Sequence, residues 1–143
     1  SIKNIRDITT SHGIHMQTDL VFKETDFSDA DMLVIPGGMP GTKYLGEYQP
    51  LCDLLTDFYK QGKKVAAICA APTVFEKYGF LEGRKATSYP AMEEELKSAD
   101  YQTDKVITSR GMGTAIDFAA KLVEIIKGTK EKDELLKSIV YGE

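Results

Sequence analysis

The sequence predicts an α/β protein with a mostly parallel sheet and helices on both faces. Two observations lead to this class. Short apolar runs at residues 32–35 and 65–69 are typical of buried strands. They alternate with segments such as 50–61, in which apolar residues recur at helical spacing. Alternation of this kind is typical of a parallel sheet that is covered on both faces.

The first half of the chain supplies two strands and one helix. We expect a strand over residues 14–22, a charged loop, and a second strand from Met32 to Ile35. A helix from Pro50 to Gln61 follows and stops at Gly62. Its buried face carries residues at positions i, i+3, i+4 and i+7, namely Leu51, Leu54, Leu55 and Phe58. Cys52 lies within this helix and is interpreted as a packing or surface residue.

The middle of the chain predicts a strand that turns at once into a helix. The strand covers Val65 to Cys69, and the helix runs from Pro72 to Tyr78 and is closed by Gly79. A short strand from Lys85 to Tyr89 and a short acidic helix from Met92 to Lys97 follow. The acidic run is interpreted as a solvated helix face, because no His or Cys accompanies it.

The last third predicts one strand and two helical segments. Residues 102–108 have room for at most one strand, and residues 108–114 form a loop. The next helix ends at Ile126, and Thr114 with Asp117 resembles a capping box at its start. Its predicted apolar face consists of Ala119, Leu122, Val123 and Ile126. A C-terminal segment from Glu131 places Leu135, Leu136, Ile139 and Val140 at helical spacing, for core packing or a subunit contact.

Length and composition are those of one globular domain, residues 1–143. No apolar run approaches the roughly 20 residues of a membrane span. The net charge of -4 argues against a nucleic-acid partner, because duplex binding relies on clustered Lys and Arg. Two cysteines do not make a disulfide framework, and free thiols favour a reducing cytoplasm.

Cys69 is the candidate nucleophile. It lies where a buried strand meets a helix, and Pro72 suits the first turn of that helix. Unpaired backbone N–H groups at the helix start favour the thiolate form of a cysteine there. Alternatively, Cys69 only closes a core strand, which is the commoner fate of a buried cysteine.

A glycine pair at the end of another strand strengthens the first interpretation. Gly37 and Gly38 follow the 32–35 strand, and residues without side chains let backbone N–H groups approach a ligand closely. They could supply an oxyanion hole opposite Cys69. Most such glycine pairs only make turns. Two strand ends with complementary chemistry are more specific than either alone.

Three ordered motifs resemble the DJ-1/PfpI family of the glutamine-amidotransferase-like superfamily. They are Ile-Pro-Gly-Gly at 35–38, Ala-Ile-Cys-Ala-Ala-Pro-Thr at 67–73 and Thr-Ser-Arg-Gly-Met-Gly-Thr at 108–114. The similarity extends from about Ser11 to Ile126 and is greatest to the bacterial and Parkinsonism-associated branch. It implies a flavodoxin-like fold with a nucleophile elbow. It also implies that Cys69 is the reactive centre and that Gly37, Gly38 and the Ala70 amide line an anion-accepting pocket.

The chain also departs from the family pattern. Family members open with a strand, a helix and a second strand, and a glutamate after the first strand hydrogen-bonds the cysteine. We expect this segment and its acid to be absent here, so that the domain is N-terminally incomplete. The two histidines, His12 and His15, lie early in the chain and do not support a Cys–His pair. Arg110 is interpreted as structural support beside the elbow, as is Pro72.

Three functions remain open on these residues. The resemblance implies glyoxalase-like or deglycase-like hydrolysis of small 2-oxoaldehydes or their adducts, with no cofactor and no metal. It also implies the alternative of a redox sensor or chaperone-like protein in which Cys69 is oxidised. The third reading is a truncated variant without activity. Expected partners are a small aldehyde or an oxidant, with no membrane, and a homodimer is possible.

Overall fold

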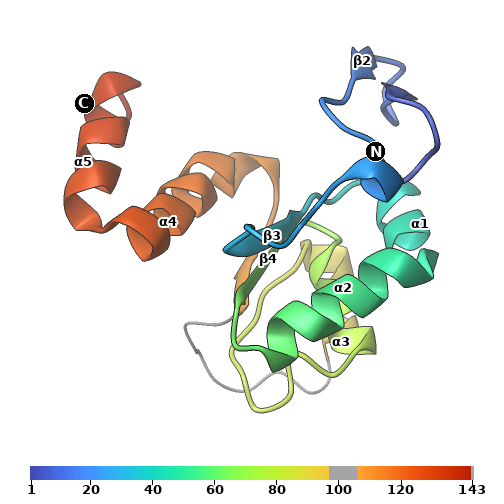
Figure 1. Ribbon diagram of the computed structural model, residues 1–143. Helices are drawn as coiled ribbons and strands as arrows, with labels where there is room; N and C mark the ends of the chain where they lie inside the picture. Colours follow the sequence, from blue (N-terminus) through green and yellow to red (C-terminus); the bar gives the residue numbers. More distant parts are fainter. Residues whose placement is uncertain (97–105, 143) are drawn as a thin grey trace.

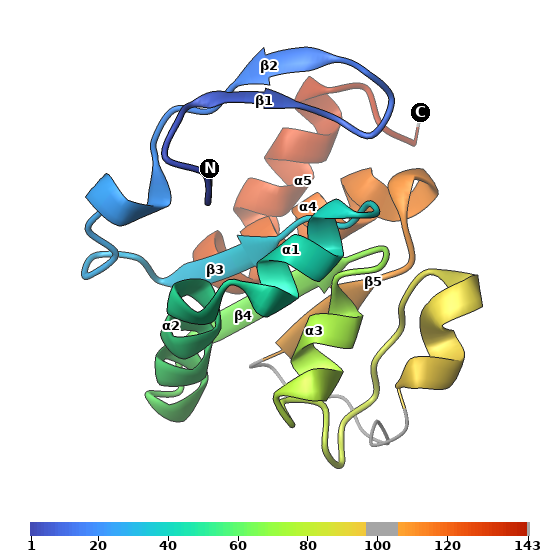
Figure 2. The same cartoon turned by 90° about the vertical axis from the view of Figure 1, so that its right-hand side faces the viewer.

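The computed structural model describes residues 1–96 and 106–142. Its main sheet has three parallel strands, β3 (Met32–Ile35), β4 (Lys64–Ile68) and β5 (Val106–Ser109), in the order β3-β4-β5. Helices α1 (Gly41–Glu47), α2 (Gln49–Lys60) and α3 (Pro72–Lys77) lie on one face. Helices α4 (Ala115–Lys127) and α5 (Thr129–Ser138) lie on the other face (Figures 1 and 2). The predicted fold class is therefore confirmed.

The main core lies between the sheet and helices α2 and α3. Side chains alternate along β3, so that Leu33 and Ile35 are buried in this core while Val34 is 48% exposed on the opposite side. The helical side chains of the core include the predicted stripe of α2. Its principal members from the helices and the following turn are Leu51, Leu55, Phe58, Val74, Phe75, Phe80 and Leu81.

The elements that were predicted around this core are largely confirmed. The predicted strand at 32–35 and helix at 72–78 match β3 and α3, and the 50–61 helix is α2, shifted by one residue. Helix α1 was not predicted. It contains two glycines and has no apolar stripe, but the buried Gly46 lets it approach Val74, whose side chain would lie 3.2 Å from a Cβ at this position. The helix follows the glycine turn directly and contacts α2 and α3.

The prediction of one long strand over residues 14–22 is wrong. The region forms a separate antiparallel hairpin of β1 (Asp7–Thr9) and β2 (His15–Gln17), followed by a 3-10 turn, η1 (Phe22–Glu24). Ile14, Met16 and Leu20 are each more than half exposed. Their alternation therefore does not mark a face that packs on the core.

The predicted strand from Lys85 to Tyr89 is also wrong. These residues do not pair with a neighbouring strand among the described residues. The Thr87 N–H, for example, donates to the side-chain hydroxyl of Thr108 at 2.9 Å. The acidic helix is a 3-10 helix, η2 (Pro90–Glu95), and the predicted end at Lys97 lies outside the described residues. Of the strand expected within 102–108, residues 102–105 also lie outside them, and Val106 begins β5.

Helix α4 buries a different face from the predicted one. Phe118 and Ala120 are buried, whereas Ala119 is exposed and Ile126 is 45% exposed. The helix contacts both β5 and α5, so its apolar residues are divided between two neighbours and do not form one stripe. No helix within the described ranges has the length and apolar character needed to cross a bilayer.

Candidate active site around Cys69

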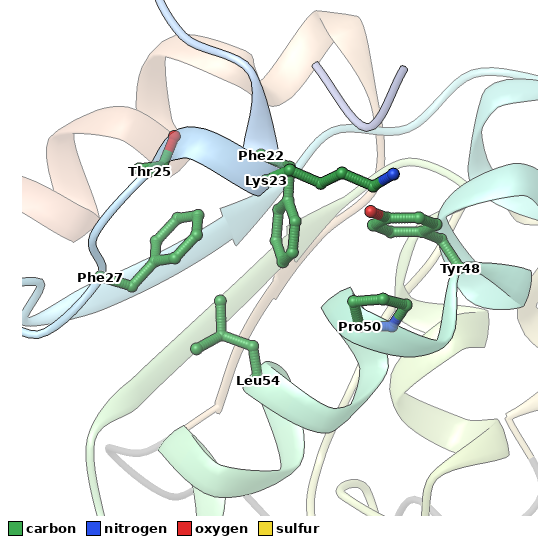
Figure 3. Close-up of a pocket in the computed structure, with 7 residues that line it drawn as sticks. All are labelled: Phe22, Lys23, Thr25, Phe27, Tyr48, Pro50 and Leu54. Atoms are coloured by element: carbon green, nitrogen blue, oxygen red, sulfur yellow. The ribbon is translucent and has the colours of Figure 1, made fainter. Parts of the chain in front are cut away.

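One pocket of about 370 Å³ lies between η1 and the start of α2 (Figure 3). Its walls are mainly apolar, and three of the lining side chains are aromatic rings. The lining residues are Phe22, Lys23, Thr25, Phe27, Tyr48, Pro50 and Leu54. None of them is a predicted site residue, and neither a cysteine nor a histidine is among them. The predicted nucleophile and oxyanion-hole residues lie at the carboxyl ends of β3 and β4 instead.

Cys69 occupies a strained turn between β4 and α3. Its φ is 66°, in the left-handed region that costs an ordinary residue about 1–2 kcal/mol. The strand ends at Ile68, one residue earlier than predicted, because Cys69 has already left the extended conformation. The Ala71 N–H donates to the Ile68 carbonyl at 3.2 Å and closes the turn. Pro72 is buried at the first position of α3, as expected for its fixed φ.

Three hydrogen bonds from other segments hold the backbone of Cys69. Its N–H donates to the Ser109 carbonyl at the end of β5, at 2.9 Å. Its carbonyl oxygen accepts bonds from the Ser88 hydroxyl at 2.7 Å and from the Tyr89 N–H at 2.8 Å. Both peptide groups that flank the Cys69 Cα are thus fixed by residues distant in the sequence.

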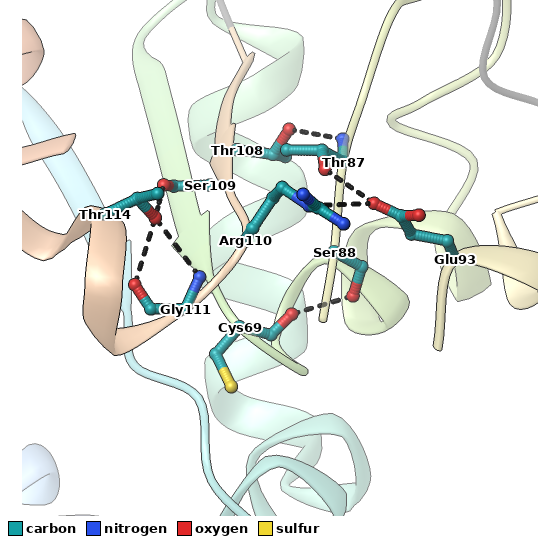
Figure 4. Close-up of polar contacts among 9 residues, drawn as sticks. All are labelled: Cys69, Thr87, Ser88, Glu93, Thr108, Ser109, Arg110, Gly111 and Thr114. Atoms are coloured by element: carbon teal, nitrogen blue, oxygen red, sulfur yellow. Dashed lines mark hydrogen bonds and ion pairs between the residues drawn. The ribbon is translucent and has the colours of Figure 1, made fainter. Parts of the chain in front are cut away.

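The thiol of Cys69 points away from this group of contacts (Figure 4). Cys69 is partly exposed, and no residue in the ranges 1–96 and 106–142 forms a hydrogen bond with its Sγ. Cys52, in contrast, is completely buried in α2, with its Sγ 3.5 Å from the Leu45 carbonyl oxygen. Of the two thiols, only that of Cys69 is accessible to a ligand.

The glycine turn after β3 lies directly against Cys69. A methyl group at Gly37 would be 2.5 Å from the Cys69 Cβ and 2.6 Å from the Ile68 carbonyl oxygen, so no side chain fits at this position. Gly38 has open space around it but a φ of 91°, which favours glycine. Parallel strands bring their carboxyl ends to one edge of the sheet, and this is how the two turns meet.

Three backbone N–H groups in these turns have no acceptor among the described residues. They belong to Gly37, Gly38 and Ala70. Ala70 is almost fully buried, and its nitrogen would be 3.0 Å from a Cβ at Gly37. A buried N–H group without an acceptor is rare in proteins and needs an explanation. A ligand oxygen with partial negative charge is the group that such donors bind best.

Arg110 directly follows β5, and its side chain forms an ion pair with Glu93 (Figure 4). Its Nε is 3.4 Å from the Glu93 carboxylate, which also accepts a bond from the Thr87 hydroxyl at 2.9 Å. Thr87 precedes Ser88, so Arg110 is connected through Glu93 to the segment that holds Cys69. The acidic run is thus not only a solvated face, since Glu93 takes part in this network.

The turn after β5 is held by its own hydroxyl groups. Ser109 and Thr114 place their hydroxyl oxygens 2.7 Å apart, and Thr114 exchanges bonds with the backbone of Gly111. The loop contains a short 3-10 turn, η3 (Met112–Thr114). The hydroxyl of Thr114 bonds within this loop and does not cap α4. The predicted capping box with Asp117 is wrong for this reason.

Sequence reasoning did not identify Ser88 as a site residue. It is completely buried, yet no sequence motif distinguishes it from the serines and threonines around it.

The histidines lie in and beside the hairpin, where the His15 Nδ1 is 3.0 Å from the Thr9 hydroxyl. Within the described ranges, no group of three His, Cys, Asp or Glu side chains is arranged to hold a metal ion.

The fold and this site define an α/β protein that presents a cysteine on a strained turn at the carboxyl end of a parallel strand. Residues 2–125 match the model of the DJ-1/PfpI family. The chain belongs to this family, as the three motifs predicted.

Curated relatives agree with this assignment. The chain is 36% identical to Protein dj-1beta of Drosophila melanogaster over 94% of its own length and 76% of the relative. It is 32% identical to the glutathione-independent glyoxalase DJR-1.2 of Caenorhabditis elegans, covering 92% of the chain and 74% of the relative. A deglycase of Pyrococcus abyssi is 31% identical, with coverage of 84% and 76%.

Two solved structures share the fold. The oxidized DJ-1 of Toxoplasma gondii superimposes with a TM-score of 0.93 at 29% identity, over 100% of this chain and 82% of that one. The crystal structure of Drosophila DJ-1beta gives a TM-score of 0.90 at 33% identity, with coverage of 96% and 78%. The family thus includes a glyoxalase and a deglycase, which supports a related role for this chain.

Proposed function

We propose that the protein is a cofactor-free enzyme that uses Cys69 to hydrolyse small 2-oxoaldehydes or their adducts with amines and thiols. One observation carries the proposal. A partly exposed thiol on a strained turn lies beside backbone N–H groups that have no acceptor among the described residues. The glyoxalase and the deglycase among the relatives support the choice of substrate class.

The first step is the addition of the Cys69 thiolate to the aldehyde carbon. A bond forms between sulfur and carbon, and the π electron pair of the carbonyl group moves onto its oxygen. The N–H groups of Ala70, Gly37 and Gly38 would bind this oxygen as its charge develops, and protonation completes a hemithioacetal. These donors are already in place, so little reorganisation is needed when the charge appears.

The later steps require proton transfer. In a 2-oxoaldehyde, a proton moves from the hemithioacetal carbon to the neighbouring carbonyl carbon, and the hemithioacetal hydroxyl proton moves to the neighbouring oxygen, which leaves the thioester of a 2-hydroxy acid. Water then releases a 2-hydroxy acid and restores the thiol, so one water is consumed for each aldehyde. No carboxylate in the described part of the chain hydrogen-bonds the thiol. The group that moves the proton is therefore not assigned to a described residue.

Methylglyoxal turnover tests this proposal. We expect the wild-type protein to convert methylglyoxal to a 2-hydroxy acid, and Cys69→Ser to reduce turnover to the background rate. Cys52→Ser is the matched control, because Cys52 is buried in α2 and takes no part in the site. Loss of turnover in both variants, or in neither, would contradict the assignment to Cys69.

A redox sensor is the second candidate function. It is favoured by the exposed thiol without a hydrogen-bond partner in the described ranges and by the relative that was solved in an oxidized form. A sensor consumes one peroxide per thiol and then stops, whereas an enzyme consumes aldehyde repeatedly. Stoichiometry measured on the same sample separates the two functions.

A further inference from the structure

Ser88 is a completely buried polar residue, and within residues 1–96 and 106–142 its side chain hydrogen-bonds only to the turn that carries Cys69. Its hydroxyl is completely enclosed and donates to the Cys69 carbonyl oxygen at 2.7 Å. The Tyr89 N–H binds the same oxygen at 2.8 Å. Together they occupy both lone pairs of that oxygen and fix the direction in which it points.

The direction of this carbonyl determines the direction of a second group. The Cys69 carbonyl and the Ala70 N–H belong to one planar peptide unit, and this peptide bond is trans. In a trans peptide the N–H points opposite to the C=O. A residue that fixes the Cys69 oxygen therefore also fixes the Ala70 N–H, which points away from Ser88.

We propose that Ser88 is a positioning residue that aims the Ala70 N–H at the oxygen of the bound carbonyl substrate. The inference rests on the proposed function, since it concerns a donor that acts when Cys69 adds to a carbonyl group. Ser88 does not touch the substrate. Its hydroxyl binds the carbonyl oxygen of the Cys69–Ala70 peptide and acts through the orientation of that peptide plane.

The chemistry of two thiol reactions provides the test. Addition to methylglyoxal places charge on a carbonyl oxygen, which the Ala70 N–H stabilises. Alkylation by iodoacetamide displaces iodide from a saturated carbon and places no charge on a carbonyl oxygen. A residue that aims the oxyanion donor affects the first reaction alone, whereas a residue that merely supports the elbow affects both.

We expect Ser88→Ala to lower the rate of methylglyoxal addition and kcat by about 10-fold to 100-fold, as a misplaced donor does. KM should change little, and the alkylation rate of Cys69 should stay within about twofold of wild type, by this argument. Ser88→Thr keeps the hydroxyl and should retain most activity. Ser138→Ala is the matched control, because it removes an equivalent hydroxyl-to-carbonyl bond of 2.7 Å in α5.

Equal losses in addition and alkylation would overturn the inference, as would no loss in either. If Ser88→Ala does not fold, Ser88→Cys replaces it, because a thiol fills the site but is a weaker donor. Addition is measured by the loss of free thiol and needs no turnover. A wild-type protein that forms the adduct without product would therefore overturn the proposed function, while the comparison of Ser88 variants would still decide the inference.

Discussion

The turns that follow β4 and β5 have the same place in the fold but are held in different ways. In the turn after β4 the two alanines that follow Cys69 are buried, and two other segments hold the Cys69 backbone by hydrogen bonds. The turn after β5 is exposed, with Met112 at 91%, and is held by hydroxyl groups within it. Each turn leads from a parallel strand into a helix on a different face of the sheet (Figure 2).

This difference shows where conformational strain can be maintained. A left-handed cysteine persists only if surrounding structure stabilises the turn by more than the strain costs. The glycine turn, the Ser88 segment and the end of β5 supply that structure around Cys69. The hydroxyl groups that hold the turn after β5 are only partly buried and support no strained residue, so substitutions in the two turns should have different effects.

The largest effect is expected from Gly37→Ala. The new methyl group would be 2.5 Å from the Cys69 Cβ and 2.6 Å from a backbone oxygen, neither of which can move easily. We expect the free energy of unfolding to fall by about 3 kcal/mol, as for severe overpacking. Urea denaturation measures this change.

Gly38→Ala is the matched control for this prediction. A methyl group at Gly38 has open space, and only its φ of 91° opposes the substitution. We expect a loss of about 1–2 kcal/mol. Equal losses at both glycines would mean that close approach to Cys69 is not what requires Gly37.

Strain at Cys69 itself predicts a smaller effect. Cys69→Gly and Cys69→Ala both remove the thiol, but only glycine adopts a φ of 66° without cost. We expect the glycine variant to unfold with a free energy about 1 kcal/mol higher than the alanine variant. Thermal and urea unfolding of the pair test this, and a more stable alanine variant would show that the turn is not strained.

The turn after β5 should tolerate change better. Thr114→Val keeps the shape of the side chain and removes the hydroxyl that bonds Gly111 and Ser109. We expect a loss of about 1 kcal/mol, the usual value for one net hydrogen bond. The alkylation rate of Cys69 should not change. A large fall in that rate would show that the two turns are coupled.

The smallest effect is expected at the contact between α4 and α5. Hydrogen bonds from Lys121 and Lys132 lower the pKa of Glu124 from its ordinary value of 4.5. A lowered pKa means that Glu124 stabilises the fold at pH values above 4.5. This contribution is lost as the pH falls through the pKa of the folded state.

Glu124→Gln tests the sign of this dependence. We expect the variant to be less stable than wild type at neutral pH, and the difference to shrink as the pH falls below 4.5 and through the pKa of Glu124 in the folded state. The difference should also shrink in high salt, because the pair is near the surface. A difference that grows as the pH falls would contradict the prediction.

The sequence contained enough information to predict β3 and β4 and to place the turns that follow these two strands close together. Apolar runs identified β3 and β4, and the carboxyl ends of parallel strands lie at one edge, so Gly37 was correctly expected near Cys69. The 14–22 strand was wrongly predicted because alternation alone does not show whether a core is present to receive Ile14 and Met16. Local patterns do not carry that information.

The residues that hold the Cys69 backbone could not be predicted from the sequence for a related reason. Ser88 lies 19 residues after Cys69 and reaches it along an irregular path, with no periodicity to indicate burial. The face of α4 was mispredicted because the helix packs against two elements. Tertiary contacts determine both features, whereas the sequence shows only local periodicity and motifs.

The contrast between the two cysteines gives the protein an internal reporter of its own opening. Cys52 has no exposed surface in α2, whereas Cys69 is partly exposed. A thiol reagent should therefore count one site in the folded chain and two once α2 has separated from the sheet. The slow labelling of Cys52 would time that separation without an engineered cysteine, and it would do so equally well in variants that lack Cys69.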